Sequence, residues 1–276
     1  MPDWSDLQKK ARSDVEAALD AWVTVLRKDL STRLRYAYTK GSALKKWETP
    51  IDYVPIISDV DIHIMLHDDD SFFSGSSESF DEALSLSTSY ENEFLRLRPD
   101  HLHIPRSQIM TINKLASVLE YVPPRSQDIR ALVGDMPNPI IQSDDDIRQI
   151  DRQNLMDYQE FIEPLPSRIF DRTGLDYWFI IRQMCWRVSP APVRLLTQIT
   201  ENPLDVWSWN RTTIAKKLEF HDYFDIAEYY KNFYLYGWDL FLSEFTSSEA
   251  YRNCTSAGYY TLVRCREEVQ KIEHER

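Results

Sequence analysis

The spacing of apolar residues in this 276-residue chain changes near residue 143, and this change most restricts what the chain can fold into. Before that point, stretches with a period of two residues alternate with stretches that have the helical period of three to four. Beyond it, every apolar stretch has the helical period. We therefore predict an α+β protein with two domains. Residues 1–143 would form a mixed sheet with helices, and residues 144–276 an all-α domain.

Alternating apolar and polar side chains predict strands over residues 33–39, 56–66 and 128–133. The helical period predicts helices over residues 13–30, 80–97 and 107–119 in the first domain. In the second domain the same period predicts helices over residues 147–162, 175–188, 192–199, 221–245 and 259–272. Aromatic residues are frequent in these last helices, and their helical spacing indicates a core rather than a stacking site.

The strand predicted over residues 56–66 carries acids within a run of β-branched residues. Asp59, Asp61 and His63 share one face, and the apolar residues between them share the other. The Cα atoms of Asp59 and Asp61 should lie about 6.5–7 Å apart. That spacing suits joint ligation of Mg²⁺ or Mn²⁺ by two carboxylates, with water and phosphate completing the shell. The alternative is that both acids are solvent-facing groups at a strand end, but unpaired acids are costly to bury in such a run.

The strand over residues 33–39 ends in Lys40-Gly41-Ser42, which predicts a tight turn before a short helix. Backbone N–H groups at such a turn, together with a serine hydroxyl, can hold phosphate oxygens. Lys40 and Lys45 flank the turn and could neutralise a triphosphate. The alternative for both lysines is a solvated position on an exposed helix.

Gly41-Ser42, followed sixteen residues later by Asp59-Val60-Asp61 on a strand, resembles the DNA polymerase β-like nucleotidyltransferase superfamily. The resemblance covers about the first half of the chain and includes the order of the predicted helices and strands. The all-α second half resembles, in architecture only, the helical C-terminal domains of the small-molecule branch, such as the aminoglycoside nucleotidyltransferases. The gap between the two motifs is longer than is usual in this family, so we expect a loop insertion there.

The resemblance implies Mg²⁺-dependent transfer of a nucleoside monophosphate from a nucleoside triphosphate, with ATP favoured, to a hydroxyl acceptor on a small molecule. Gly41 and Ser42 would hold the β- and γ-phosphates, and Asp59 and Asp61 would hold the metal. The family has a third carboxylate on a neighbouring strand, which serves as a metal ligand or as the base. Asp128, at the head of the strand predicted over residues 128–133, is the candidate for that role.

Acidic residues outnumber basic residues, 44 to 32, which gives a formal net charge of −12. This charge disfavours nucleic acid and anionic membranes as partners. The three cysteines lack metal-ligand spacing, and we find neither a signal peptide nor an apolar stretch long enough to span a bilayer, so we expect a cytoplasmic protein.

Two other functions remain open. The chain could be a degenerate, non-catalytic nucleotide-binding or interaction protein. It could also be a protein- or RNA-directed transferase of a toxin–antitoxin type. The third carboxylate and measurable pyrophosphate release separate the enzyme from the non-catalytic protein, and salt-sensitive RNA binding would favour the RNA-directed enzyme.

Overall fold

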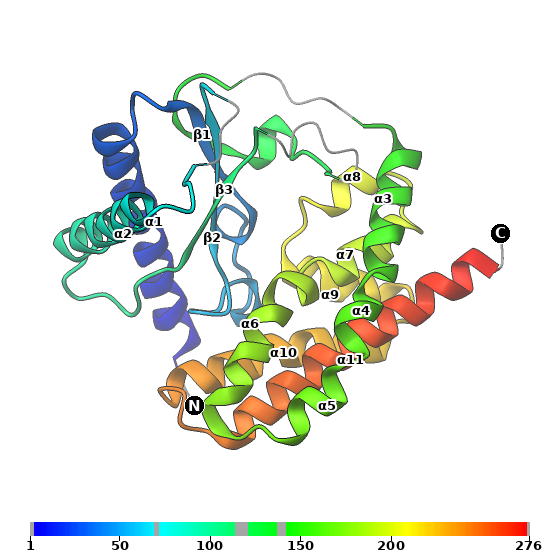
Figure 1. Ribbon diagram of the computed structural model, residues 1–276. Coiled ribbons are helices and arrows are strands. Elements are labelled where there is room, and N and C mark those ends of the chain that lie inside the picture. The colour runs from blue at the N-terminus through cyan, green and yellow to red at the C-terminus, as the bar shows by residue number, and fades with distance from the viewer. Residues whose placement is uncertain (1–2, 69–71, 114–120, 137–141, 275–276) are drawn as a thin grey trace. The chain divides into compact units, whose positions relative to one another are not determined.

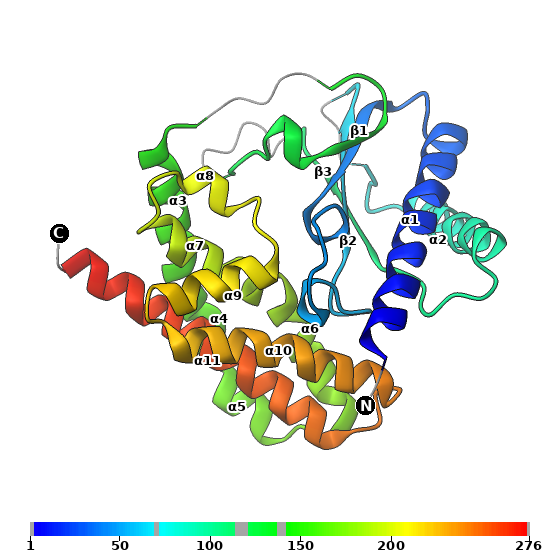
Figure 2. The same cartoon turned by 180° about the vertical axis from the view of Figure 1, so that it is seen from behind.

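The computed structural model describes residues 3–68, 72–113, 121–136 and 142–274 (Figures 1 and 2). The chain divides into two compact units. Residues 1–44 and 58–141 form the first, here called the sheet unit, and residues 45–57 and 142–276 form the second, here called the helical unit. An α+β protein with a helical C-terminal region is therefore confirmed. The segment 45–57 lies in the helical unit, although the sequence-based prediction placed it in the first domain.

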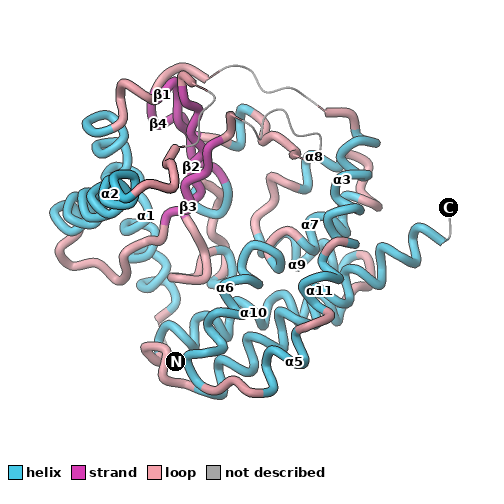
Figure 3. The backbone as a smooth tube through the Cα atoms, in the orientation of Figure 1, coloured by secondary structure: helices cyan, strands magenta, loops and turns pink. Residues whose placement is uncertain are grey.

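All strands of the described residues belong to the sheet unit, where they form one four-stranded sheet in the order β3-β2-β1-β4 (Figure 3). The central strands β1 (Leu34–Lys40) and β2 (Val60–Leu66) are antiparallel. Strand β3 (Ser107–Thr111) runs parallel to β2, and β4 (Arg130–Val133) runs antiparallel to β1. The mixed sheet is thus present, with β3 and β4 at its edges.

Strand β3 corrects part of the prediction, because residues 107–111 were expected to begin a helix over residues 107–119. The apolar residues of this segment fit a helical period, but a run this short fits either structure. Backbone pairing with β2, from Val60 opposite Ser107 to Ile64 opposite Thr111, decides in favour of the strand. Residues 114–119 of the predicted helix lie outside the described residues.

Two helices, α1 (Trp4–Asp29) and α2 (Ser77–Leu97), cover one face of the sheet (Figures 1 and 2). The buried residues Val60, Ile62 and Ile64 of β2 point to this face, and the alternation of the strand was the basis for predicting it. Helix α1 begins nine residues earlier than the predicted residue 13, because the Asp3 side chain accepts hydrogen bonds from Ser5 N and Asp6 N and caps it.

A buried acid on α1 explains the sequence Asp100-His101-Leu102-His103. Asp14 accepts hydrogen bonds from Leu102 N at 2.9 Å, from His103 N at 3.0 Å and from Arg98 Nε at 3.2 Å. Burial by itself would raise the pKa of Asp14, but the hydrogen bonds and charge of His103 and its neighbours hold it below the usual value. His103 therefore serves to anchor the loop before β3.

The helical unit consists of helices around an aromatic core. They are η2 (Pro50–Asp52), α3 (Asp144–Met156), α4 (Tyr158–Ile162), α5 (Leu165–Phe170), η5 (Gly174–Asp176), α6 (Tyr177–Val188), α7 (Ala191–Thr197), α8 (Pro203–Val206), α9 (Arg211–Phe220), α10 (Phe224–Leu242) and α11 (Ser248–His274). Tyr230, Phe233, Tyr234 and Trp238 are almost completely buried there, so their prediction as core residues is confirmed, whereas Trp186 is 48% exposed. No described helix is both long and apolar enough to cross a membrane.

Candidate functional site

The Gly41 turn and the Asp61 carboxylate meet at one end of the sheet. Lys40, the last residue of β1, pairs across the ladder with Asp61 of β2. Gly41 follows with φ of +80°, and a Cβ atom placed on it would overlap the Asp61 carboxylate. Only glycine fits here, because any side chain would collide with the acid and the backbone angle is itself unfavourable for other residues. Two motifs that are distant in sequence are therefore adjacent in space.

Ser42 lies in the short 3₁₀ turn η1 (Gly41–Ala43), which replaces the short helix expected at this point. The Arg12 side chain on α1 donates a hydrogen bond of 2.6 Å to Ala43 O, and Leu44 N donates one of 3.1 Å to Gly41 O. These contacts fix the backbone of the turn. Ser42 is half-buried within this turn.

Lys40 places a half-buried ammonium group beside Asp61. Burial lowers the pKa of Lys40, and the nearby Asp61 charge opposes that shift. Its Nζ atom lies 5.8 Å from the centroid of the Tyr121 ring. A cation so close to Asp61 partly neutralises the acid, and it could equally contact an anionic ligand.

His63 points to the same face as Asp61, but it is buried among tyrosines. Its Nδ1 atom lies 2.9 Å from Tyr38 Oη and 3.3 Å from Tyr121 Oη. Burial, helped by the Lys40 charge, lowers the pKa of His63 to about 3. The imidazole is therefore neutral at physiological pH and too weak a base to accept a substrate proton, which makes it a structural group.

Asp59 precedes β2 and forms an ion pair with Arg106, which precedes β3. The two strands are joined at this point by a backbone hydrogen bond of 2.9 Å from Val60 N to Arg106 O. Sequence analysis missed Arg106 because it lies just before the segment predicted as a helix. A cation that binds Asp59 must compete with the Arg106 guanidinium.

No carboxylate lies beside Asp61 on the neighbouring strand. The parallel register puts Gln108 of β3 opposite Asp61. Asp128 belongs to the 3₁₀ turn η4 (Ser126–Asp128) before β4, where it pairs with Arg125 at 2.8 Å. Strand β4 pairs with β1 and not with β2, so Asp128 does not head the strand next to Asp59 and Asp61. Among the described residues, no group of three or more His, Cys, Asp or Glu could hold a metal ion.

Lys45 lies in the helical unit, where its Nζ atom donates hydrogen bonds of 2.8 Å to both Trp207 O and Trp209 O. Hydrogen bonds to carbonyl oxygens offset the cost of removing an ammonium group from water. This arrangement gives Lys45 a structural role in place of the phosphate contact expected from its position in the sequence.

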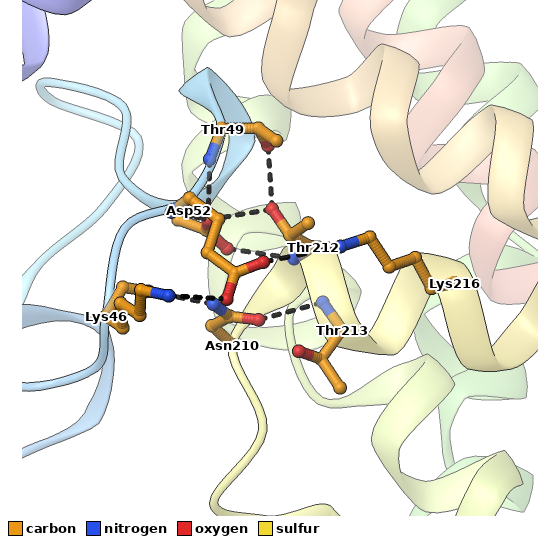
Figure 4. Close-up of polar contacts among 8 residues, drawn as sticks. Lys46, Thr49, Asp52, Asn210, Thr212, Thr213 and Lys216 are labelled. Carbon is orange, nitrogen blue, oxygen red and sulfur yellow. Dashed lines mark hydrogen bonds and ion pairs between the residues drawn. The ribbon is translucent and has the colours of Figure 1, made fainter.

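The segment 45–57 accounts for the long gap between the two motifs, and a buried acid attaches it to the helical unit (Figure 4). Asp52 accepts hydrogen bonds from Glu48 N at 2.7 Å and from Thr49 N at 3.0 Å. It also accepts bonds from Thr212 N at 2.8 Å and from Thr212 Oγ1 at 2.7 Å. The predicted loop insertion is therefore an ordered part of the helical unit.

The structure thus gathers Lys40, Gly41, Ser42, Asp59 and Asp61 at one end of the sheet, and it leaves Lys45 and Asp128 out of that group. Two carboxylates, a hydroxyl and a fixed turn can bind a cation and a phosphate chain together. Comparisons of the chain with protein-family models, with curated proteins and with solved structures found no match.

Proposed function

We propose that the sheet unit binds a nucleoside triphosphate with Mg²⁺ or Mn²⁺, and that it transfers a nucleoside monophosphate to the hydroxyl of a small-molecule acceptor. The triphosphate, with ATP favoured, would lie along the turn at Gly41 and Ser42. Asp59 and Asp61 would hold the cation, and Lys40 would contact the phosphates. Pyrophosphate would be the leaving group.

The contact between Gly41 and Asp61 carries this proposal. A metal–triphosphate complex needs backbone N–H groups for its phosphates and carboxylates for its cation within a few ångströms of each other. A turn that accepts only glycine brings the backbone close enough to provide both. The order and directions of β1, β2 and β3 are also compatible with the resemblance to the DNA polymerase β-like superfamily.

The donor set fits a cation that arrives with its nucleotide. Asp59 and Asp61 supply two carboxylates, and the amide oxygen of Gln108, opposite Asp61, is a further neutral oxygen donor. Two acids form a poor cage for Mg²⁺ alone, so triphosphate oxygens must complete the shell. The bound cation would neutralise the phosphate oxygens and polarise the phosphorus centre.

Gln108 also favours a second function, namely nucleotide binding without transfer. An amide cannot accept a proton from the acceptor hydroxyl as a carboxylate would. His63 does not replace it, since the imidazole is buried and its Nδ1 atom lies against the hydroxyls of Tyr38 and Tyr121. A non-catalytic nucleotide-binding protein would keep every residue at this site and simply lack turnover.

Calorimetric titration with ATP, in Mg²⁺ and then in EDTA, tests the binding. We expect saturable binding that requires Mg²⁺, and an affinity at least about tenfold lower in Asp61→Asn because the carboxylate contributes only through the cation. Asp20→Asn is the matched control, since the same change is made at an exposed acid on α1. Equal losses in both variants, or metal-independent binding, would refute the assignment.

Pyrophosphate release with pooled hydroxyl acceptors then separates the two functions. Release that depends on an acceptor and disappears in Asp61→Asn supports the transferase. Binding without release, with each of the four nucleoside triphosphates, supports the non-catalytic protein.

A further inference from the structure

A cavity of about 540 Å³ lies within the sheet unit, on the face of the sheet that α1 and α2 cover. Its apolar walls come from α1, α2, β2 and the segment before α2, and they include Trp22, Leu26, Ile64, Phe73, Leu86 and Tyr90. This volume is in the range of cavities that enclose small organic ligands. Ile64, Ile109 and Thr111 line it, whereas Asp61 and Gln108 point to the opposite face of the same strands. The cavity therefore lies on the face of the sheet opposite Asp61. Arg106, which lines the cavity, pairs with Asp59 of the proposed nucleotide site, so the charge argument below applies to the protein without bound nucleotide and metal.

The polar atoms of the two largest wall residues are already used within the protein. The rings of Trp22 and Tyr90 are stacked with centroids 4.7 Å apart. Trp22 Nε1 donates a hydrogen bond of 2.6 Å to Ser107 Oγ, and Tyr90 Oη donates one of 2.5 Å to Pro105 O. Burial raises the pKa of Tyr90, so this hydroxyl stays neutral. These bonds orient both rings. The stack covers one face of each ring, and the apolar ring surface that still lines the cavity favours an aromatic or hydrocarbon group.

Charge limits the ligand further. Of the residues that the structure describes, two charged ones line the cavity, Arg106 and Glu91. The Arg106 guanidinium is paired with Asp59, so its charge is largely neutralised. Glu91 is exposed and would repel an anion that enters from solvent. We propose that this cavity binds an uncharged, predominantly apolar small molecule that contains an aromatic ring system or a hydrocarbon group of similar size.

Two fluorescent probes with the same ring system test the ligand class. N-phenyl-1-naphthylamine is uncharged, and 8-anilinonaphthalene-1-sulfonate adds a sulfonate to it. We expect saturable binding of the uncharged probe at one site of the full-length chain, with an affinity at least about fivefold higher than that of the sulfonate. Glu91→Gln should reduce the difference in affinity between the two probes, because it removes the charge that repels the sulfonate. Absence of saturable binding, or a preference for the sulfonate, would overturn the proposal.

Two neighbouring residues of α2 test the location. Ala83 lines the cavity, whereas Leu84 is 53% exposed and does not line it. Ala83→Phe should fill the cavity and weaken binding of the uncharged probe at least about tenfold, and Leu84→Phe should leave it unchanged. Circular dichroism checks the fold of both variants, and Ser87→Leu provides a second filling variant if Ala83→Phe does not fold. Equal affinities in the filling variants and in Leu84→Phe would place the probe elsewhere and overturn the proposal.

Discussion

Asp52 and Asp61 are nine residues apart in the chain, but they have different surroundings. Asp52, in the segment 45–57, is buried and accepts four hydrogen bonds from backbone and side-chain donors of the helical unit. Asp61, in β2, is half-buried and lies against a glycine turn and a lysine of the sheet unit. The carboxylate oxygens of Asp52 therefore accept hydrogen bonds from within the protein. The role of an acid thus depends on which donors the fold brings to it. We expect substitution of Asp52 to lower the stability of the protein, and substitution of Asp61 to lower its affinity for ligand.

The largest effect is expected for Asp52→Ala, measured as the free energy of unfolding in urea. This change leaves buried N–H groups and the Thr212 hydroxyl without their acceptor, so we expect a loss of about 3–5 kcal/mol. Asp171→Ala, an exposed acid in the same unit, is the control and should change stability by less than about 0.5 kcal/mol. A loss below about 1 kcal/mol in Asp52→Ala would show that the two acids do not differ in this way.

A second buried acid of the helical unit, Asp151, makes the stability of the protein depend on pH. Asp151 on α3 is fully buried, and burial raises its pKa to about 6, in spite of Arg194 nearby. The folded protein therefore holds a proton that the unfolded chain releases near its ordinary pKa of 3.8. Stability from this group is lost as the pH rises between these two values, by up to about 3 kcal/mol.

Asp151→Asn removes that titration, so its stability relative to the wild type should be about 2–3 kcal/mol more favourable at pH 7 than at pH 4. Asp145→Asn, at an exposed position of the same helix, should show no such change between the two pH values. His63 in the sheet unit has a lowered pKa, so its effect on stability has the opposite dependence on pH: the stability that it contributes is lost as the pH falls. Urea unfolding of the wild type, Asp151→Asn and Asp145→Asn at pH 4 and pH 7 measures these differences in stability.

Asp61→Asn is expected to lower ligand affinity while it leaves the stability of the protein nearly unchanged. The affinity for Mg²⁺–ATP should fall at least about tenfold, which corresponds to 1.4 kcal/mol or more. The unfolding free energy should change by less than about 1 kcal/mol, since Asp61 is only half-buried. If stability instead fell as far as in Asp52→Ala, Asp61 would be a structural acid like Asp52.

The smallest effect is expected for Gln108→Asp. A carboxylate opposite Asp61 adds a third negative charge to the end of the sheet, so Mg²⁺-dependent ATP affinity should rise about two- to fivefold. Gln108→Ala is the control and should not raise it. A lower affinity in Gln108→Asp would indicate that Gln108 does not face the cation.

Several features of the fold could be predicted from the sequence because they depend on local patterns. The alternation in β1 and β2 sets which residues face α1 and α2, and the helical period of the second half predicts its class. The spacing of Asp59 and Asp61 gives them one face because side chains alternate along any strand. Gly41 and Asp61 could be paired only through the family resemblance, since nothing local joins residues so far apart in the chain.

The tertiary structure decided what local patterns leave open. Residues 107–111 became a strand because the edge of β2 offered backbone partners to a segment whose apolar spacing fits either structure. Asp128 does not lie on a strand next to Asp61 because β4 pairs with β1 and not with β2, and strand order is a property of the assembled sheet. Lys45 and Asp52 acquired structural roles because carbonyl and N–H groups more than 150 residues away needed partners when they were buried. The sequence shows which polar side chains could bind a ligand. Only the tertiary structure shows which of them form hydrogen bonds within the protein instead, because polar groups that are removed from water must pair with other groups of the protein.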